Sequence, residues 1–142
     1  MSERLTIDRF CELFASGPFD ETTISRLDPY YAADVVFTDP LQTVRGRSAF
    51  MAMNRRLISR ARSIRFDVVD RAQDGDQLFV TWVMVMRPKL PAPTLRIEGV
   101  THCILRDGLV AVHRDYWDLL GSVMDTIPIV GGLYRRAVAR LG

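Results

Sequence analysis

The stretch TLRIEGVTHCILRDGLVAVHRDYWD, residues 94–118, decides the fold that we predict for this chain. Two runs in which apolar and polar residues alternate flank the dipeptide Asp107-Gly108, which favours a two-residue hairpin turn. The second run is unusual for a strand of a folded core, because it places His113, Arg114 and Asp115 beside aromatic residues. The register of this hairpin determines which of these polar side chains face the interior.

A regular two-residue turn at this dipeptide pairs His102 with His113 and Val100 with Asp115. One face of the hairpin then carries Arg96, Glu98, Val100, His102, Ile104, Ala111, His113, Asp115 and Trp117. Two imidazoles and two carboxylates of this face lie within cross-strand reach, about 4.5 to 8 Å. If the face lines a cavity, these groups form a candidate acid/base cluster, and if it faces solvent, they are ordinary exposed charges.

Around this hairpin, the sequence predicts helices first and then a run of antiparallel strands, an α+β fold. We expect helices at 6–15, from about 23, and at 46–61, with a short strand at 35–40 that ends at a proline. Strands at 63–72 and 77–86 flank a second hairpin dipeptide, Asp74-Gly75. Residues 119–142 are expected to form a short helical tail that packs on the domain.

Length and composition indicate one domain spanning residues 1–142, with 48% apolar residues to build a core. No apolar run is long enough to span a membrane, and the polar start MSERLTIDRF lacks the core of a secretory signal. Cys11 and Cys103 are too few for a disulfide framework and are expected to be small buried side chains. We therefore expect a cytoplasmic protein.

The positive charge is carried almost entirely by arginine, since Lys89 is the one lysine among 19 basic residues. Arginines are dense between Arg45 and Arg65, where no acid occurs. This segment fits either an anion-binding patch or a solvated helix face, and we favour the second. Because no aromatic residues suited to base stacking alternate with these arginines, we expect no nucleic-acid partner.

The strand expected at 77–86, QLFVTWVMVM, is apolar on both faces. One face meets the helices, and the other needs a second cover. A second copy of the chain is the simplest cover, so we predict a homodimer through the outer face of the sheet.

Several motifs in order resemble those of the nuclear transport factor 2-like superfamily, which includes ketosteroid isomerases, limonene epoxide hydrolase and SnoaL-like polyketide cyclases. The motifs are YYAADVVFTDP, VRGRSAF, DGDQLFVTW, LRDGLV and HRDYWDL, and the resemblance covers Leu5 to about Leu120. It implies a curved antiparallel sheet wrapped around three helices, a cone with an apolar pocket. It also implies dimers through the outer face of the sheet and places the His/Asp face inside the cone.

The resemblance to the isomerases gives Asp39, in FTDP, the position of the carboxylate base. The positions of the two oxyanion donors fall on Phe10 and Val100, and neither side chain donates a hydrogen bond. Asp115 lies opposite Val100 in the predicted register, so a carboxyl group could act from the neighbouring strand. For Asp39, capping of a turn before Pro40 is an equally good interpretation.

The resemblance to the other two groups concerns Asp115. It matches the last aspartate of the epoxide hydrolase triad, whose other members fall near Trp82 and Met84 and are missing. The SnoaL-like cyclases use an acid/base aspartate with a nearby histidine, which Asp115 with His102 or His113 resembles most closely. Two histidines and a carboxylate also resemble a metal site, but strand spacing separates them, and we expect neither a metal nor a cofactor.

Our candidate catalytic residues are therefore Asp115, His102, His113 and Asp39. The side chains that we expect to contact a ligand are Phe10, Phe14, Phe37, Trp82, Met84, Glu98, Val100 and Trp117. The first hypothesis is an acid/base enzyme of the isomerase, cyclase or hydrolase type. Its partner would be a small, largely apolar carbonyl compound, such as a polyketide- or steroid-like molecule. The alternative is a non-catalytic module that binds a hydrophobic ligand or dimerises.

Overall fold

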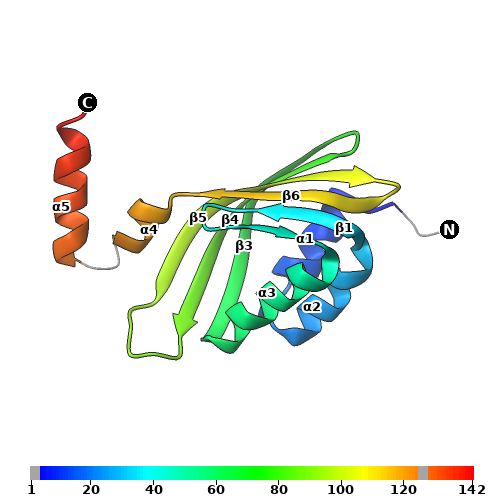
Figure 1. The fold of residues 1–142 in the computed structure, drawn as a ribbon, viewed down its shortest axis with the longest axis horizontal. Coiled ribbons are helices and arrows are strands. Elements are labelled where there is room, and N and C mark those ends of the chain that lie inside the picture. Colours follow the sequence, from blue (N-terminus) through cyan, green and yellow to red (C-terminus); the bar gives the residue numbers. More distant parts are fainter. Residues whose placement is uncertain (1–3, 125–127) are drawn as a thin grey trace.

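A computed structural model of the chain describes residues 4–124 and 128–142, and the predicted α+β fold is confirmed (Figure 1). Helices α1 (Ile7–Ala15), α2 (Glu21–Leu27) and α3 (Arg47–Ser59) cover one face of a curved sheet. The strands are β1 (Tyr31–Thr38), β2 (Thr43–Arg45), β3 (Ala61–Asp74), β4 (Gln77–Pro88), β5 (Leu95–Arg106) and β6 (Leu109–Trp117). Their order is β2-β1-β6-β5-β4-β3, and only the β1–β6 pair is parallel.

Helices α1 and α2 begin where the sequence supplies side-chain caps. Thr6 Oγ1 accepts a hydrogen bond from the Arg9 amide at the start of α1, as predicted. Asp20 and Thr23 form a reciprocal capping box at the start of α2, two residues earlier than expected. A short 3-10 helix with Pro29 (Asp28–Tyr30) then leads into β1. Helix α1 buries Phe10, Cys11, Leu13 and Phe14, so its apolar side faces the sheet.

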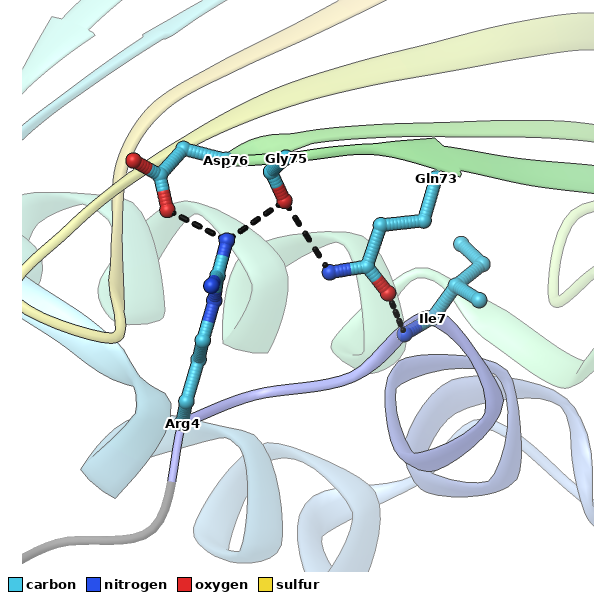
Figure 2. A network of polar contacts seen from close by, with 5 residues as sticks. All are labelled: Arg4, Ile7, Gln73, Gly75 and Asp76. Carbon is cyan, nitrogen blue, oxygen red and sulfur yellow. Dashed lines mark hydrogen bonds and ion pairs between the residues drawn. The ribbon is translucent and has the colours of Figure 1, made fainter.

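Polar contacts hold the N-terminal segment against the turn of the β3–β4 hairpin (Figure 2). Arg4 Nη2 donates to the Gly75 carbonyl and to Asp76 Oδ1, each at 2.6 Å. Gln73 Oε1 accepts a hydrogen bond from the Ile7 amide at 3.1 Å, and Gln73 Nε2 donates to the Gly75 carbonyl at 3.2 Å. These contacts fix the start of α1 against the sheet and so set the position of its two phenylalanines.

Both predicted hairpins form, and one turn is displaced. Arg106 pairs with Leu109, so Asp107 and Gly108 form the turn with φ angles of 53° and 79°. In the first hairpin Asp74 pairs with Gln77, which makes Gly75-Asp76 the turn, one residue later than predicted.

A β-bulge in β6 changes the register that we predicted for the second hairpin. Val110 pairs with Leu105 but Val112 pairs with Ile104, so Ala111 is an extra residue in β6. Beyond the bulge Asp115 pairs with Thr101, and the predicted pairing of Asp115 with Val100 is wrong. Cys103 is opposite His113, and the predicted pairing of His102 with His113 is also wrong. Because one extra residue inverts the alternation, β6 turns His113 and Asp115 inward while β5 turns His102 outward.

The core lies between the helices and the concave face of the sheet. Its most deeply buried side chains are Leu5, Ile24, Tyr31, Val35, Ile64, Leu78, Val80, Cys103 and Val110. The tail forms two helices where we predicted one. Helix α4 (Leu119–Met124) contacts β5, and α5 (Pro128–Ala139) lies next to α4 beyond the end of the sheet (Figure 1). Within the described residues, every helix is too short or too polar to cross a membrane.

Candidate active site

A cavity of about 70 Å³ lies between the helices and the sheet. Aromatic rings form most of its wall: Phe10, Phe14, Phe19, Phe50, Phe66 and Trp82. Ile24, Leu27 and Met51 complete the apolar part. The polar side chains that reach it are Tyr31, Asn54, Thr101, His113 and Asp115. The cavity therefore combines an apolar wall with a small set of convergent polar groups.

Five of these side chains form one continuous hydrogen-bonded chain. Tyr31 Oη lies 2.9 Å from His113 Nδ1, and His113 Nε2 lies 2.9 Å from Asp115 Oδ1. Thr101 Oγ1 donates to the same Asp115 oxygen at 2.6 Å, and Trp82 Nε1 donates to Thr101 Oγ1 at 2.8 Å. The chain fixes the orientation of the imidazole and the carboxylate from both ends.

Four strands position this chain. His113 and Asp115 follow the bulge in β6, and Thr101 faces Asp115 from β5. Tyr31 begins β1, the parallel neighbour of β6. Trp82, on β4, pairs with Gly99 of β5, where a Cβ atom would lie 2.5 Å from the indole ring. The absence of a side chain at Gly99 thus leaves room for the indole to reach Thr101.

Burial and the neighbouring groups shift the pKa of His113 in opposite directions. Burial disfavours the imidazolium, but the surrounding Tyr31, Cys103 and Asp115 outweigh it and raise the pKa of His113 well above 6.5. Burial also raises the pKa of Tyr31, so its phenol stays protonated. The cavity therefore sets an imidazole with a raised pKa against the Asp115 carboxyl group, beside a neutral phenol.

The protonation state of His113 decides which hydrogens remain available. When His113 is protonated it donates from both nitrogens, so that Tyr31 Oη accepts from Nδ1 and Asp115 Oδ1 accepts from Nε2. The hydroxyl hydrogen of Tyr31 then has no acceptor among the described residues. Asp115 Oδ2 likewise receives no hydrogen bond from the part of the chain that the structure describes. A ligand in the cavity would thus meet one free donor and one free carboxylate oxygen.

Asp39 lies outside this cavity, in an open groove of about 440 Å³ at the ends of β1 and β6. Its Oδ1 accepts hydrogen bonds from the Leu41 and Gln42 amides at 2.8 and 3.0 Å, which is the turn role that we weighed for it. Burial raises the pKa of Asp39, and Asp115 adds to that effect. Asp115 lines both the groove and the cavity, so it borders the two hollows.

The structure separates His102, Glu98 and Val100 from the cavity, and their predicted orientation is wrong. His102 Nε2 lies 2.9 Å from Gln77 Oε1, and its ring stacks on Phe79 with centroids 4.6 Å apart on the outer face. Glu98 and Val100 line a hollow on that same face. The bulge at Ala111 explains why all three orientations were predicted wrongly, because it shifts β5 by one residue relative to β6.

The remaining predicted ligand contacts lie on the inner side of the sheet. Phe10, Phe14 and Trp82 line the cavity. Phe37 is buried and contacts the His113 ring edge-to-face, with centroids 5.1 Å apart. Met84 and Trp117 pack against the core, and Trp117 also lines the groove.

Sequence reasoning missed Tyr31 and Thr101. A single tyrosine at the start of a strand gives no local signal that it will reach a histidine 82 residues away. Thr101 was placed on the packing face of the hairpin, and the bulge makes that same face the cavity wall. Among the described residues, no three His, Cys, Asp or Glu side chains are grouped so as to hold a metal ion.

Comparison with known families explains this arrangement of helices and sheet. Residues 7–113 match the model of the SnoaL-like domain. The chain belongs to the SnoaL-like family. None of the curated proteins compared with it matches.

Solved structures share the fold of this SnoaL-like domain. A putative SnoaL-like polyketide cyclase from Jannaschia sp. CCS1 aligns with a TM-score of 0.71 at 21% identity, covering 89% of this chain and 97% of its own. An LEH-like epoxide hydrolase of M. tuberculosis aligns with a TM-score of 0.67 at 17% identity, covering 95% and 91%. A protein of ketosteroid isomerase-like fold from Catenulispora acidiphila, solved in complex with trimethylamine, aligns with a TM-score of 0.66 at 18% identity, covering 82% and 85%. These likenesses confirm the predicted fold, and the match to the SnoaL-like domain confirms the superfamily that the sequence motifs predicted.

Proposed function

We propose that this SnoaL-like domain is an acid/base enzyme for a small, largely apolar carbonyl compound, with Asp115 and His113 as its reacting pair. The observation that carries the proposal is the pair itself, at 2.9 Å in a cavity walled by aromatic rings. Titratable groups with perturbed pKa values at a cavity are typical of catalytic sites.

In the proposed reaction, Asp115 Oδ2 removes a proton from the carbon next to the carbonyl group. The electron pair of that C–H bond forms an enolate, and its oxygen accepts a hydrogen bond from the Tyr31 hydroxyl. The imidazolium of His113 donates to Tyr31 Oη and makes that hydroxyl a stronger donor. Where the substrate carries a C=C bond between its β- and γ-carbons, this enolate is a dienolate, and Asp115 then returns the proton to the γ-carbon. The double bond moves into conjugation with the carbonyl group, which completes an isomerisation with no net gain or loss of atoms.

The size of the cavity limits what enters it. A volume of about 70 Å³ corresponds to only a few non-hydrogen atoms. A polyketide- or steroid-like compound is larger than this, so in our proposal only its carbonyl end enters. The rest of the molecule would lie in the open groove, where Asp39 supplies a second carboxylate and Trp117 an apolar surface.

The second candidate is a non-catalytic module that binds a hydrophobic ligand. The observation that favours it is the wall of the cavity, where aromatic rings leave little free volume around the polar pair. The likeness to a structure solved with trimethylamine agrees equally well with either function.

The test is proton exchange at the α-carbon of a panel of small cyclic ketones in D₂O, followed by ¹H NMR. We expect the full chain to accelerate exchange and Asp115→Asn to lower the rate at least about a hundredfold, since a positioned general base contributes that much. Asp70→Asn, at an exposed carboxylate, is the matched control and should leave the rate unchanged. Equal rates for Asp115→Asn and the wild type would exclude Asp115 from the reaction. Quenching of tryptophan fluorescence without any exchange would support the binding module.

We also propose that two copies associate through the outer face of the sheet. Five large apolar side chains on its strands remain exposed in one copy: Val69, Phe79, Ile104, Val112 and Tyr116. A surface of this kind is typical of a protein–protein contact. Size-exclusion chromatography with light scattering should give a dimer for the wild type and a monomer for Ile104→Lys/Val112→Lys. A monomeric wild type would exclude this interface.

A further inference from the structure

Two segments without acidic residues come together at the end of the β3–β4 pair. Neither residues 40–66 nor residues 77–97 contain Asp or Glu. The register of β3 and β4 joins them, with Ala61 opposite Pro88 and Ser63 opposite Arg87. The Lys89 amide donates to the Arg60 carbonyl at 3.0 Å, which continues the pairing beyond β4. Positive charge therefore gathers at this end of the sheet, although the whole chain carries only +2.

Ion pairs neutralise some of the cations in this basic region and leave the others without an acidic partner among the described residues. Three arginines of the first segment have acidic partners: Arg47 with Asp28, Arg55 with Glu21 and Arg65 with Asp67. Arg60, Arg62, Arg87 and Lys89 are exposed and make no ion pair with any described acid. Like charges on neighbouring strands repel one another, so this group of four cations lowers stability unless an anion lies among them.

The end of the sheet at which these four cations lie contains a hollow. A depression of about 510 Å³ lies between the ends of the two strands and the loop 89–94. Its charged wall is Arg62 and Arg87, and Ser63 and Thr94 add two hydroxyl groups. The proline-rich loop, with Pro91 at the hollow, forms the opposite wall. A concave site with two guanidinium groups and two hydroxyls fits an oxyanion, since arginine binds phosphate through paired N–H donors.

We propose that this hollow, separate from the catalytic cavity, binds the phosphoryl group of a phosphorylated small molecule. The size of the hollow suits one such group with a short attached chain. No aromatic side chain lines it, so it lacks the stacking surface that single-stranded nucleic acid uses. Polar and charged groups also outweigh apolar contact here, in contrast to the aromatic wall of the inner cavity.

The test is calorimetric titration of the full chain with inorganic pyrophosphate at constant ionic strength. We expect saturable binding to the wild type and a loss of affinity of about tenfold or more in Arg62→Gln/Arg87→Gln, because two charge-assisted contacts are removed. Arg26→Gln/Arg45→Gln removes the same charge from exposed positions outside the hollow and is the matched control. This control should keep at least half of the wild-type affinity.

Three results would overturn the proposal. The first is no saturable binding of pyrophosphate to the wild type. The second is an equal loss in the two double variants, which would show that net charge alone attracts the anion. The third is binding of a single-stranded oligonucleotide, dependent on Arg62 and Arg87, in the absence of pyrophosphate binding. None of these results depends on turnover, so the outcome is independent of the proposed enzyme activity.

Discussion

Thr101 is the side chain on which the position of the Asp115 carboxylate depends. Its hydroxyl donates to Asp115 Oδ1 and accepts from Trp82 Nε1, so one buried oxygen serves two partners. Replacing it with an apolar group would leave the indole N–H without an acceptor and remove a donor to a charged group. Both losses lower the free energy of unfolding, because a buried group without a partner has no water to replace it.

We therefore expect Thr101→Val to lower the free energy of unfolding by about 1 to 3 kcal/mol. Thr101→Ser keeps the hydroxyl and loses one methyl group, so it should cost about 1 kcal/mol or less. Urea denaturation followed by tryptophan fluorescence measures both. If the valine variant were as stable as the serine variant, the hydrogen bonds of Thr101 would contribute nothing to the fold.

At this scale the sequence allowed three of the five side chains in the hydrogen-bonded chain, His113, Asp115 and Trp82, to be predicted as site residues. His113 and Asp115 stand out because charged residues interrupt an apolar alternation, which is a local signal. Tyr31 and Thr101 carry no such signal, since their roles arise from the pairing of β1 with β6 and from the bulge. For the same reason His102 was placed on the wrong face.

At the scale of elements, the hairpin turns and the bulge differ in what determines them. The turns follow from local chemistry, because Asp107 and the glycines adopt the left-handed conformations that such turns need. The bulge allows both Val110 and Ala111 to be buried beside β1, a consequence of packing between distant parts of the chain. The presence of a hairpin turn at each Asp-Gly dipeptide was therefore predictable to within one residue, and the register beyond residue 110 was not.

The approach of β4 to β5 gives a prediction at this scale. Gly99→Ala would place a Cβ atom 2.5 Å from the Trp82 ring, so the indole must move away from Thr101. We expect a loss of about 1 to 3 kcal/mol in the free energy of unfolding, typical of overpacking. Gly17→Ala is the matched control, because nothing lies within 4 Å of the added atom. Chemical denaturation compares the two, and an equal effect would contradict the close approach.

At the scale of the whole molecule, the buried pair links stability to pH. The folded chain raises the pKa of His113 above 6.5, so it binds this proton more tightly than the unfolded chain does. The stabilising contribution is complete below pH 6.5 and is lost as the pH rises through the folded-state pKa. The raised pKa of Asp39 acts in the acid range instead, and that of Tyr31 acts only at strongly alkaline pH.

We therefore expect the free energy of unfolding to fall as the pH rises from 6.5 into the alkaline range. His113→Gln should flatten this dependence while leaving the change of stability with pH in the acid range unchanged. Urea denaturation at a series of pH values measures both proteins. A wild-type stability that rises over this range would contradict a raised pKa of His113.

The central claim is that His113 and Asp115 form an enclosed charged pair, and the titration of the His113 imidazole tests it most directly. The chain holds only 2 histidines, so His102→Gln leaves His113 as the single imidazole to follow by ¹H–¹³C NMR. In this background we expect a pKa above 6.5, which Asp115→Asn should lower because burial then acts without the opposing carboxylate. A pKa at or below 6.5 that does not respond to Asp115→Asn would contradict the account.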